Sequence, residues 1–83
     1  MSDYSVYILE CSDKSFYCGI TTDIDRRVKM HNKGKASKCT RSRLPVKLIY
    51  IENGYSKSSA LKREYEIKQL TRAQKEKLVE KYR

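Results

Sequence analysis

The sequence predicts an α+β fold, a small three-stranded antiparallel sheet flanked by three helices in the order β-β-α-β-α-α. Two runs of β-branched and aromatic residues near the N-terminus are separated by three polar residues, and a third run follows the single proline. Three further stretches begin with residues that favour a helix N-cap. Because 83 residues cannot bury two separate cores, we expect one domain over residues 1–83.

The first two strands are expected at Tyr4–Cys11 and Ser15–Thr21, joined as a β-hairpin by a three-residue loop. This loop length predicts a register in which Tyr7 lies opposite Gly19. Tyr7 and Tyr17 then project from the same face of the sheet, and Gly19 leaves room for the ring of Tyr7. A loop one residue shorter would send the two tyrosines to opposite faces.

The first helix is expected from about Asp23 to Lys33, with Thr22 as its N-cap and Gly34 as the residue that closes it. Its sheet-facing stripe has residues at i, i+3, i+4 and i+7, and two of its four members are polar. The stripe consists of Ile24, Arg27, Val28 and His31.

A turn-rich basic segment, residues 34–45, leads to a third strand at Val46–Glu52. Ser56 can cap the second helix, and Thr71 and Gln74 form a capping-box pattern at the start of the third helix. The second helix carries a charged residue on its apolar stripe. This stripe consists of Ala60, Leu61, Glu64 and Ile67, and the docking residues of the third helix are Leu78, Val79 and Tyr82.

Positive charge is concentrated in one part of the chain. The net charge is +9, and nine Lys or Arg residues lie between residues 26 and 47, while no acidic residue occurs between Asp25 and Glu52. This segregation favours a polyanionic partner, most often nucleic acid, because each phosphate neutralised by Lys or Arg releases counterions. The residues expected to contact nucleic acid are Arg26, Lys33, Lys35, Lys38, Arg41 and Arg43.

Membrane features are missing from the sequence. No apolar run approaches the roughly 20 residues needed to span a bilayer. The N-terminus lacks the basic and apolar regions of a signal peptide, and no amphipathic helix with a large apolar face accompanies the positive charge. We therefore expect a soluble, cytoplasmic protein with no membrane partner.

Each candidate site residue also has a purely structural explanation. Arg27 could extend its aliphatic stem over the core, and His31 could be a hydrogen-bonded histidine at the margin of the core. Tyr7 and Tyr17 are, by default, half-buried strand tyrosines. Glu64 is harder to explain, because a carboxylate among apolar residues loses solvation unless it meets a cation, a donor or a metal. An ion pair with Arg27 would compensate the Glu64 carboxylate for this lost solvation.

Together, these residues match the chemistry of phosphodiester hydrolysis. That reaction needs a metal to neutralise charge, a base to activate water and a cation for the non-bridging oxygens. Glu64 can supply the metal ligand and Arg27 the cation. A tyrosine or His31 can supply the base.

The same residues make the chain similar to the GIY-YIG nucleases. The first half of the family signature resembles Ser5-Val6-Tyr7, and the second half resembles Tyr17-Cys18-Gly19. Downstream, Arg27 followed four residues later by His31 resembles the family's helix, and Glu64 resembles its metal-binding glutamate. The similarity extends over roughly residues 4–78 and is typical of the small single-domain members of the family.

The resemblance implies a nuclease, because members of the family act in excision repair, intron homing and junction resolution. Its expected substrate is DNA rather than RNA, in branched, damaged or single-stranded form. Glu64 would hold one Mg²⁺ or Mn²⁺ ion, and Arg27 would contact the scissile phosphate. Tyr7 or His31 would help to deprotonate the attacking water, and Tyr17 would orient the water or the phosphate. Two alternatives remain, a non-catalytic nucleic-acid-binding module and a nuclease subunit that needs a larger protein partner for substrate choice.

Overall fold

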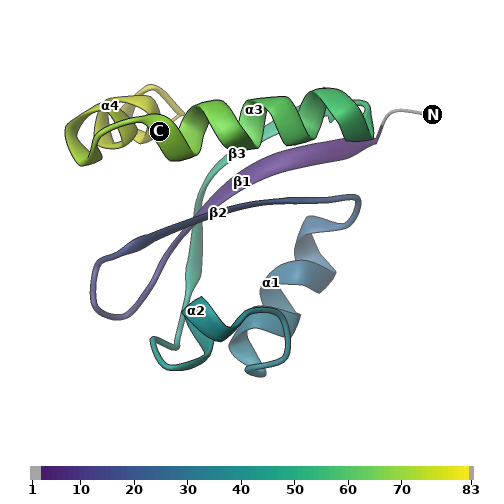
Figure 1. The fold of residues 1–83 in the computed structure, drawn as a ribbon. Coiled ribbons are helices and arrows are strands. Elements are labelled where there is room, and N and C mark those ends of the chain that lie inside the picture. Colours follow the sequence, from purple (N-terminus) through teal and green to yellow (C-terminus); the bar gives the residue numbers. More distant parts are fainter. Residues whose placement is uncertain (1–2, 83) are drawn as a thin grey trace.

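The computed structural model describes residues 3–82 and confirms the predicted α+β arrangement. Three antiparallel strands and three longer helices follow in the expected order, and a one-turn helix lies in the basic segment before the third strand (Figure 1). No helix in this part of the chain is long and apolar enough to cross a membrane. The elements are β1 (Tyr4–Glu10), β2 (Phe16–Thr21), α1 (Ile24–Asn32), α2 (Lys38–Arg41), β3 (Lys47–Tyr55), α3 (Lys57–Gln69) and α4 (Arg72–Tyr82).

β1 is the central strand of the sheet, whose order is β2-β1-β3. β1 and β2 pair in the predicted register, with Tyr7 opposite Gly19. The turn between them is closed by a hydrogen bond of 2.8 Å from the N–H of Cys11 to the carbonyl of Ser15. Tyr7 and Tyr17 therefore project from the same face, as the loop length predicted.

β3 is longer than predicted and continues to Tyr55 instead of ending at Glu52. The turn-forming residues Asn53 and Gly54 lie within the strand, because the pairing with β1 shifts in register and brings Tyr4 opposite Tyr55. Such irregularities insert residues into a strand without ending the ladder, which local turn propensity cannot anticipate.

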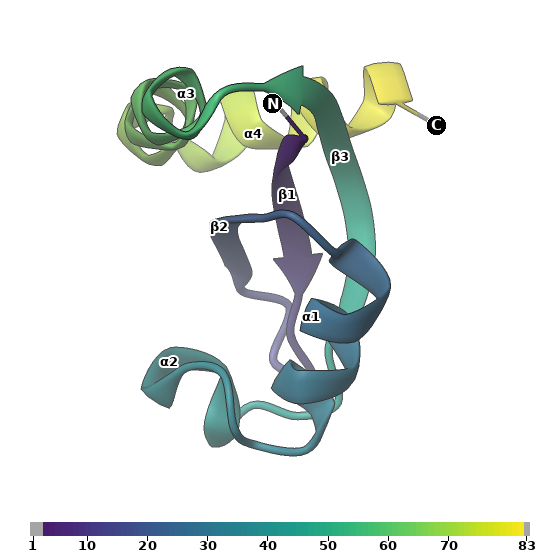
Figure 2. The ribbon, with the colours of Figure 1, turned by 90° about the vertical axis from the view of Figure 1, so that its right-hand side faces the viewer.

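The helices cover both faces of the sheet, with α3 and α4 on one side and α1 and α2 on the other (Figures 1 and 2). The buried side chains accordingly form two clusters, because successive residues of a strand point to opposite faces. The cluster on the α3 side contains Val6, Ile8, Cys18, Ile49, Tyr50, Ala60, Ile67 and Val79. The cluster on the α1 side contains Tyr7, Leu9, Cys11 and Val46.

α1 begins one residue later than expected. Its N-cap is Asp23 rather than Thr22, because the Asp23 side chain accepts a hydrogen bond of 3.2 Å from the N–H of Arg26. The hydroxyl of Thr21 accepts a hydrogen bond from the N–H of Asp23 at 3.1 Å and holds the turn. Gly34 closes the helix as predicted, with a φ of 73° that favours glycine.

The N-caps predicted for α3 and α4 are both confirmed. The side chain of Ser56 accepts a hydrogen bond from the N–H of Ser59, and the side chain of Ser59 accepts one from the N–H of Ser56. In α4 the side chain of Gln74 accepts from the N–H of Thr71 at 2.9 Å, and the hydroxyl of Thr71 accepts from the N–H of Gln74 at 3.2 Å. These reciprocal bonds satisfy N–H groups that a helix leaves unpaired.

The buried stripes of the two C-terminal helices are narrower than predicted. Ala60 and Ile67 of α3 are fully buried, but Leu61 is 46% exposed. Ala60 and Ile67 lie two turns apart on one line of contact with the sheet, whereas Leu61 is rotated about 100° from Ala60. In α4, Val79 is buried as expected, while Tyr82 is 52% exposed.

Candidate active site

Three aromatic side chains from three elements meet on the α1 face of the sheet. Tyr7 comes from β1, Tyr17 from β2 and His31 from α1. The ring centroids of Tyr17 and His31 are 5.1 Å apart, those of Tyr7 and His31 are 6.1 Å apart, and those of the two tyrosines are 6.4 Å apart. The rings are tilted or edge to face, which are favoured arrangements of aromatic pairs. The fold therefore brings these candidate residues into one cluster.

His31 is the centre of a buried chain of hydrogen bonds. Its Nε2 lies 3.1 Å from Oη of Tyr7, and its Nδ1 lies 2.9 Å from Oγ1 of Thr40. The Thr40 hydroxyl also lies 3.3 Å from the carbonyl oxygen of Ser37, to which it can donate. With both ring nitrogens bonded inside the protein, His31 has no nitrogen left for a water molecule or a ligand.

The burial of His31 and Tyr7 is deeper than expected. His31 is 1% exposed and Tyr7 is 2% exposed, although we expected a histidine at the margin of the core and a half-buried tyrosine. The hydrogen bonds explain the difference, because a polar group can be buried at little cost once its donors and acceptors have partners.

Burial keeps both partners of the Tyr7–His31 hydrogen bond uncharged. The pKa of His31 is lowered by burial and, to a smaller extent, by the positive charge of Arg27. The pKa of Tyr7 is raised, first by burial and then by the neighbouring Tyr17. At neutral pH the pair is therefore a neutral phenol beside a neutral imidazole.

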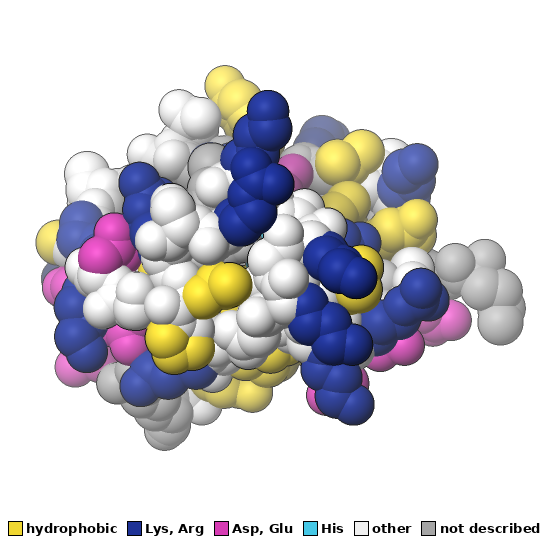
Figure 3. Space-filling view, turned by 90° about the horizontal axis from the view of Figure 1, so that it is seen from below, with side chains coloured by type: hydrophobic (Ala, Val, Ile, Leu, Met, Phe, Trp, Pro, Cys, Tyr) yellow, Lys and Arg dark blue, Asp and Glu magenta, His cyan; other side chains and the backbone are white. Residues whose placement is uncertain are grey.

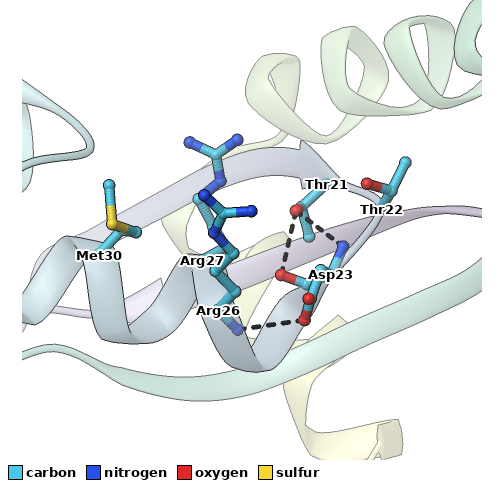
Figure 4. Close-up of a pocket in the computed structure, with 6 residues that line it drawn as sticks. All are labelled: Thr21, Thr22, Asp23, Arg26, Arg27 and Met30. Carbon is cyan, nitrogen blue, oxygen red and sulfur yellow. Dashed lines mark hydrogen bonds between the residues drawn. The ribbon is translucent and has the colours of Figure 1, made fainter.

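Arg27 lies one helical turn before His31, and its side chain is exposed. Together with Arg26, Met30 and residues 21–23 it lines a pocket of about 290 Å³. Figure 4 shows the guanidinium groups of Arg26 and Arg27 extending in the same direction from α1. Within residues 3–82 neither guanidinium group forms a hydrogen bond or an ion pair. Both can therefore take phosphate oxygens, for which the planar guanidinium is well suited.

Glu64 lies on α3 and pairs with Lys68, not with Arg27. Its carboxylate is 3.4 Å from Nζ of Lys68, one turn further along the helix, and its side chain is 20% exposed. The alternative pairing with Arg27 is not formed, because α1 and α3 lie on opposite faces of the sheet (Figure 2). Glu64 is nevertheless close to the β1–β2 hairpin, as the pKa of Cys18 in β2 shows. This pKa is raised to about 12, first by the burial of Cys18 and second by the negative charge of Glu64.

The charge of Glu64 also reaches the aromatic cluster. It adds a small contribution to the raised pKa of Tyr7, for which burial is the main cause. No hydrogen bond joins Glu64 to Tyr7 within the described residues. In the same part of the chain no three His, Cys, Asp or Glu side chains are grouped so as to share a metal ion. A metal held at Glu64 would depend on this single carboxylate together with oxygens of water or substrate.

The elements that carry these residues match a known family over nearly the whole chain. Residues 3–77 match the family model of the GIY-YIG catalytic domain. The chain belongs to the GIY-YIG family. The GIY-YIG proteins form a superfamily of nucleases, which act on nucleic acid. The match confirms the resemblance found in the sequence.

Relatives of this GIY-YIG chain have nearly the same length. The UPF0213 protein of Halobacterium salinarum is 56% identical over 75 residues, which are 90% of this chain and 97% of that protein. The UPF0213 protein of Haloquadratum walsbyi is 53% identical over 81 residues, which are 96% of this chain and 91% of that protein.

Two solution NMR structures have a similar fold. That of the UPF0213 protein from Bacillus halodurans is 51% identical in sequence, with a TM-score of 0.60 over 96% of this chain and 84% of that chain. That of a protein from E. faecalis is 39% identical, with a TM-score of 0.65 over 99% of this chain and 88% of that chain.

The basic residues expected to contact nucleic acid surround the α1 and α2 side of the GIY-YIG domain. Figure 3 views this side and shows Lys and Arg side chains spread across it, with Asp and Glu mostly toward its margins. Arg43 also forms an ion pair of 3.1 Å with Asp13, so its charge is partly balanced. The six residues, all exposed, are Arg26 in α1, Lys33 at its C-cap, Lys38 and Arg41 in α2, and Lys35 and Arg43 outside the helices.

The one-turn helix α2 and the residue that it places in the site were not predicted from the sequence. Residues 34–45 were expected to form turns, and a single helical turn has no hydrophobic periodicity by which it could be recognised. Within this turn Thr40 is fully buried and contacts His31. A lone β-branched residue in a basic stretch was its only indication in the sequence.

Proposed function

We propose that this GIY-YIG domain is a divalent-metal-dependent nuclease that hydrolyses phosphodiester bonds in DNA. The observation that carries the proposal is the placement of Tyr7, hydrogen-bonded to His31, near the exposed guanidinium of Arg27 on the same helix as His31. A group that can take a proton from water thus lies near a cation suited to phosphate oxygens. Phosphodiester hydrolysis needs both.

Of the two candidate bases, Tyr7 is better able to contact the attacking water. Both nitrogens of His31 are used in hydrogen bonds within the protein, whereas the Tyr7 hydroxyl donates one hydrogen and keeps lone pairs that can accept another. Water can then lose a proton to Oη of Tyr7 while Tyr7 passes its own proton to Nε2 of His31. This exchange avoids a free phenolate, which burial disfavours.

Arg27 and Tyr17 complete the groups that we assign to the substrate. Arg27 would contact the non-bridging oxygens of the scissile phosphate, because its guanidinium is exposed and unpaired within the described residues. Tyr17 packs against His31 and is more exposed than Tyr7, so its hydroxyl would orient the water or the phosphate.

Glu64 is the residue to which we assign one Mg²⁺ or Mn²⁺ ion. Magnesium in proteins is commonly held by one or two carboxylates and keeps several of its waters, so a single, partly exposed carboxylate fits it. The ion pair with Lys68 joins neighbouring turns of one helix, and such pairs are weak enough to be displaced. When bound, the ion would neutralise charge on the phosphate and the leaving oxygen.

The basic surface on the α1 and α2 side supports a nucleic-acid substrate. Its Lys and Arg side chains can contact phosphates without reading bases, so we expect substrate choice to follow the shape of the nucleic acid more than its sequence. DNA is proposed over RNA because the nucleases that the sequence resembles act on DNA. A partner protein could restrict this choice further.

A cleavage assay on the purified chain tests the proposal. Labelled duplex, single-stranded and branched DNA, and a matched RNA, would be incubated with the chain in Mg²⁺, in Mn²⁺ and in a chelator. We expect cleavage of DNA only when the metal is present, and its loss in Arg27→Ala. Binding of every substrate without cleavage of any would instead support a non-catalytic nucleic-acid-binding module.

A further inference from the structure

We infer that Thr40 is a positioning residue that holds His31 in the tautomer with the hydrogen on Nδ1, so that Nε2 is left as the acceptor for the Tyr7 hydroxyl. The inference rests on the proposed function only in its claim that the tautomer of His31 affects the cleavage rate. The tautomer itself can be measured whether or not the chain cleaves DNA.

The burial of Thr40 is unusual for its place in the chain. The side chains of the neighbouring basic residues Lys38 and Arg41 are exposed, whereas Thr40 is 0% exposed. Its hydroxyl lies between Nδ1 of His31 at 2.9 Å and the carbonyl oxygen of Ser37 at 3.3 Å. The one-turn helix α2 therefore directs one hydroxyl group into the site while it presents basic side chains to solvent.

The number of available hydrogens indicates which atom donates in each hydrogen bond from Tyr7 to Ser37. Hydrogens are available on Oη of Tyr7, on one ring nitrogen of His31 and on Oγ1 of Thr40. With the hydrogen on Nδ1, Tyr7 donates to Nε2, Nδ1 donates to Thr40, and Thr40 donates to the carbonyl of Ser37. Every hydrogen then has an acceptor.

The other tautomer leaves one hydrogen without an acceptor. If Nε2 carried the hydrogen, His31 would donate to Tyr7, and Thr40 would donate to Nδ1. The hydroxyl hydrogen of Tyr7 would then have no acceptor within residues 3–82, in a side chain that is 2% exposed. The tautomer with the hydrogen on Nδ1 is thus the one that pairs the Tyr7 hydrogen inside the protein without relying on a water molecule, and this favours it at a buried site.

This selection matters because a neutral imidazole in water prefers the hydrogen on Nε2. In that state His31 could not accept a proton from Tyr7, and the transfer described above would stop. With the hydrogen on Nδ1, water gives one proton to Tyr7, and Tyr7 gives one to Nε2. The hydroxide oxygen bonds to phosphorus as the bond to the leaving oxygen breaks. The leaving oxygen keeps the electron pair and takes a proton from solvent, and Nε2 of His31 then gives up its added proton so that the site returns to its neutral state. Two bonds set the tautomer together: Nε2 accepts the Tyr7 hydrogen, and Thr40 accepts the hydrogen that Nδ1 must then carry.

The tautomer can be read directly by nitrogen NMR. The chain has one histidine, so untagged ¹⁵N-labelled protein gives a single set of ring-nitrogen signals. At neutral pH we expect a protonated Nδ1 and an unprotonated Nε2. A protonated Nε2 in the unaltered protein would overturn the inference without any substitution.

Two substitutions at Thr40 separate positioning from packing. Thr40→Val keeps a branched side chain but removes the hydroxyl, and we expect it to shift His31 toward the tautomer with the hydrogen on Nε2. Thr40→Ser keeps the hydroxyl and loses only a methyl group, and we expect it to retain the original tautomer. A folded Thr40→Val protein that keeps the hydrogen on Nδ1 would show that Thr40 only packs. If Thr40→Val does not fold, loss of the original tautomer in Thr40→Ser would count equally against the inference.

Cleavage rates provide the second readout. Thr40→Val should lower kcat by roughly 10²-fold with little change in KM, and Thr40→Ser should restore most of it, since general acid–base catalysis contributes on this scale. If neither the unaltered protein nor any variant cleaves DNA, the proposed function fails. The NMR result still decides the tautomer of His31. If cleavage is strong but unaffected by Thr40→Val, the nuclease assignment stands and the role of Thr40 falls.

Discussion

A Cβ atom added to Gly19 would lie 2.7 Å from the hydroxyl oxygen of Tyr7, closer than Cβ atoms approach other heavy atoms. Gly19→Ala is therefore expected to displace the Tyr7 ring and to lengthen its hydrogen bond to His31. Overpacking of this kind costs about 1–3 kcal/mol in the free energy of unfolding. We expect cleavage to fall further than this destabilisation explains, when rates are measured at a temperature at which thermal melts show the variant folded.

Gly54→Ala is a matched control for that substitution. A Cβ atom there meets no heavy atom within 4 Å, and the cost arises only from its φ of 88°. We expect it to lower stability by about 1–2 kcal/mol and to leave the cleavage rate of the folded protein unchanged. Equal losses of activity in the two variants would mean that the contact between Gly19 and Tyr7 has no special importance.

Arg27→Ala should lower kcat by about 10²-fold or more while changing binding little, because a contact to the scissile phosphate strengthens in the transition state. Arg26→Ala, one position earlier on the same helix, should mainly weaken binding. Single-turnover cleavage and separate binding measurements distinguish the two effects. An Arg27→Ala protein with weaker binding and unaltered kcat would reduce Arg27 to a docking residue.

Glu64→Gln should abolish metal-dependent cleavage and leave the fold intact, because it removes the anionic ligand while keeping its size. Glu66 is the control, since its side chain is 63% exposed and pairs with Arg63 at 3.3 Å. Glu66→Gln should behave as the unaltered protein in cleavage across a manganese titration. Equal activity of the two variants, or inactivity of Glu64→Gln that simply follows early melting, would remove Glu64 from the metal site.

Reversal of three charges on the basic surface should weaken binding of every DNA substrate by a similar factor, because phosphate contacts carry no sequence information. The logarithm of affinity should fall with the logarithm of salt concentration with a slope of about −0.7 to −0.9 per phosphate contacted, and the slope should be shallower in the variant. Fluorescence anisotropy over a salt series measures both. The variant is Lys35→Glu, Lys38→Glu and Arg41→Glu, and its control reverses Lys57, Lys62 and Lys77 of α3 and α4, where we expect a smaller effect.

Acid stability should depend on Glu52. Two hydrogen bonds from Arg63, at 2.8 and 2.9 Å, and others from Tyr50 and Tyr55 lower the pKa of Glu52 to about 2 despite partial burial. Because the folded-state pKa lies below the unfolded value of 4.5, the stabilisation is fully present above pH 4.5 and is lost as the pH falls toward 2. Its magnitude is on the order of 3 kcal/mol.

Chemical denaturation at several pH values tests this dependence. Glu52→Gln should be less stable at neutral pH and should lose most of the change in stability between pH 4.5 and 2. Glu80→Gln, at an exposed position of α4, should keep it. A Glu52→Gln protein with the same acid dependence as the unaltered chain would assign that dependence to other carboxylates.

Local rules predicted much of this fold because they depend on neighbouring residues alone. The three-residue loop fixed the register that sets Tyr7 opposite Gly19, and the caps at Ser56 and Thr71 follow from hydrogen bonds within four residues. The continuation of β3 to Tyr55 could not be predicted, because it depends on pairing with a strand some fifty residues away.

The site was predicted in its residues but not in its contacts. Tyr7, Tyr17 and His31 were expected to act together, and the fold does bring their rings together. Thr40 was given no role from the sequence, since its place beside His31 arises from the docking of α2. The alternative pairing of Glu64 with Arg27 is not formed, and the sequence could not show this because the distance between α1 and α3 is a property of the folded sheet. The ion pair with Lys68 joins residues four apart on one helix, so it could have been predicted from the sequence.

The hydrogen-bond chain from Tyr7 to Thr40 joins elements of very different local stability. β1 is paired on both sides, so its amide hydrogens should exchange with solvent only through near-global unfolding. α2 is a single turn, and such short helices open readily. Each local opening of α2 withdraws the Thr40 hydroxyl from His31 while β1 stays closed. The fraction of molecules in which the hydrogen bonds from Tyr7 to Thr40 are all formed therefore follows the opening equilibrium of α2, not the stability of the whole protein.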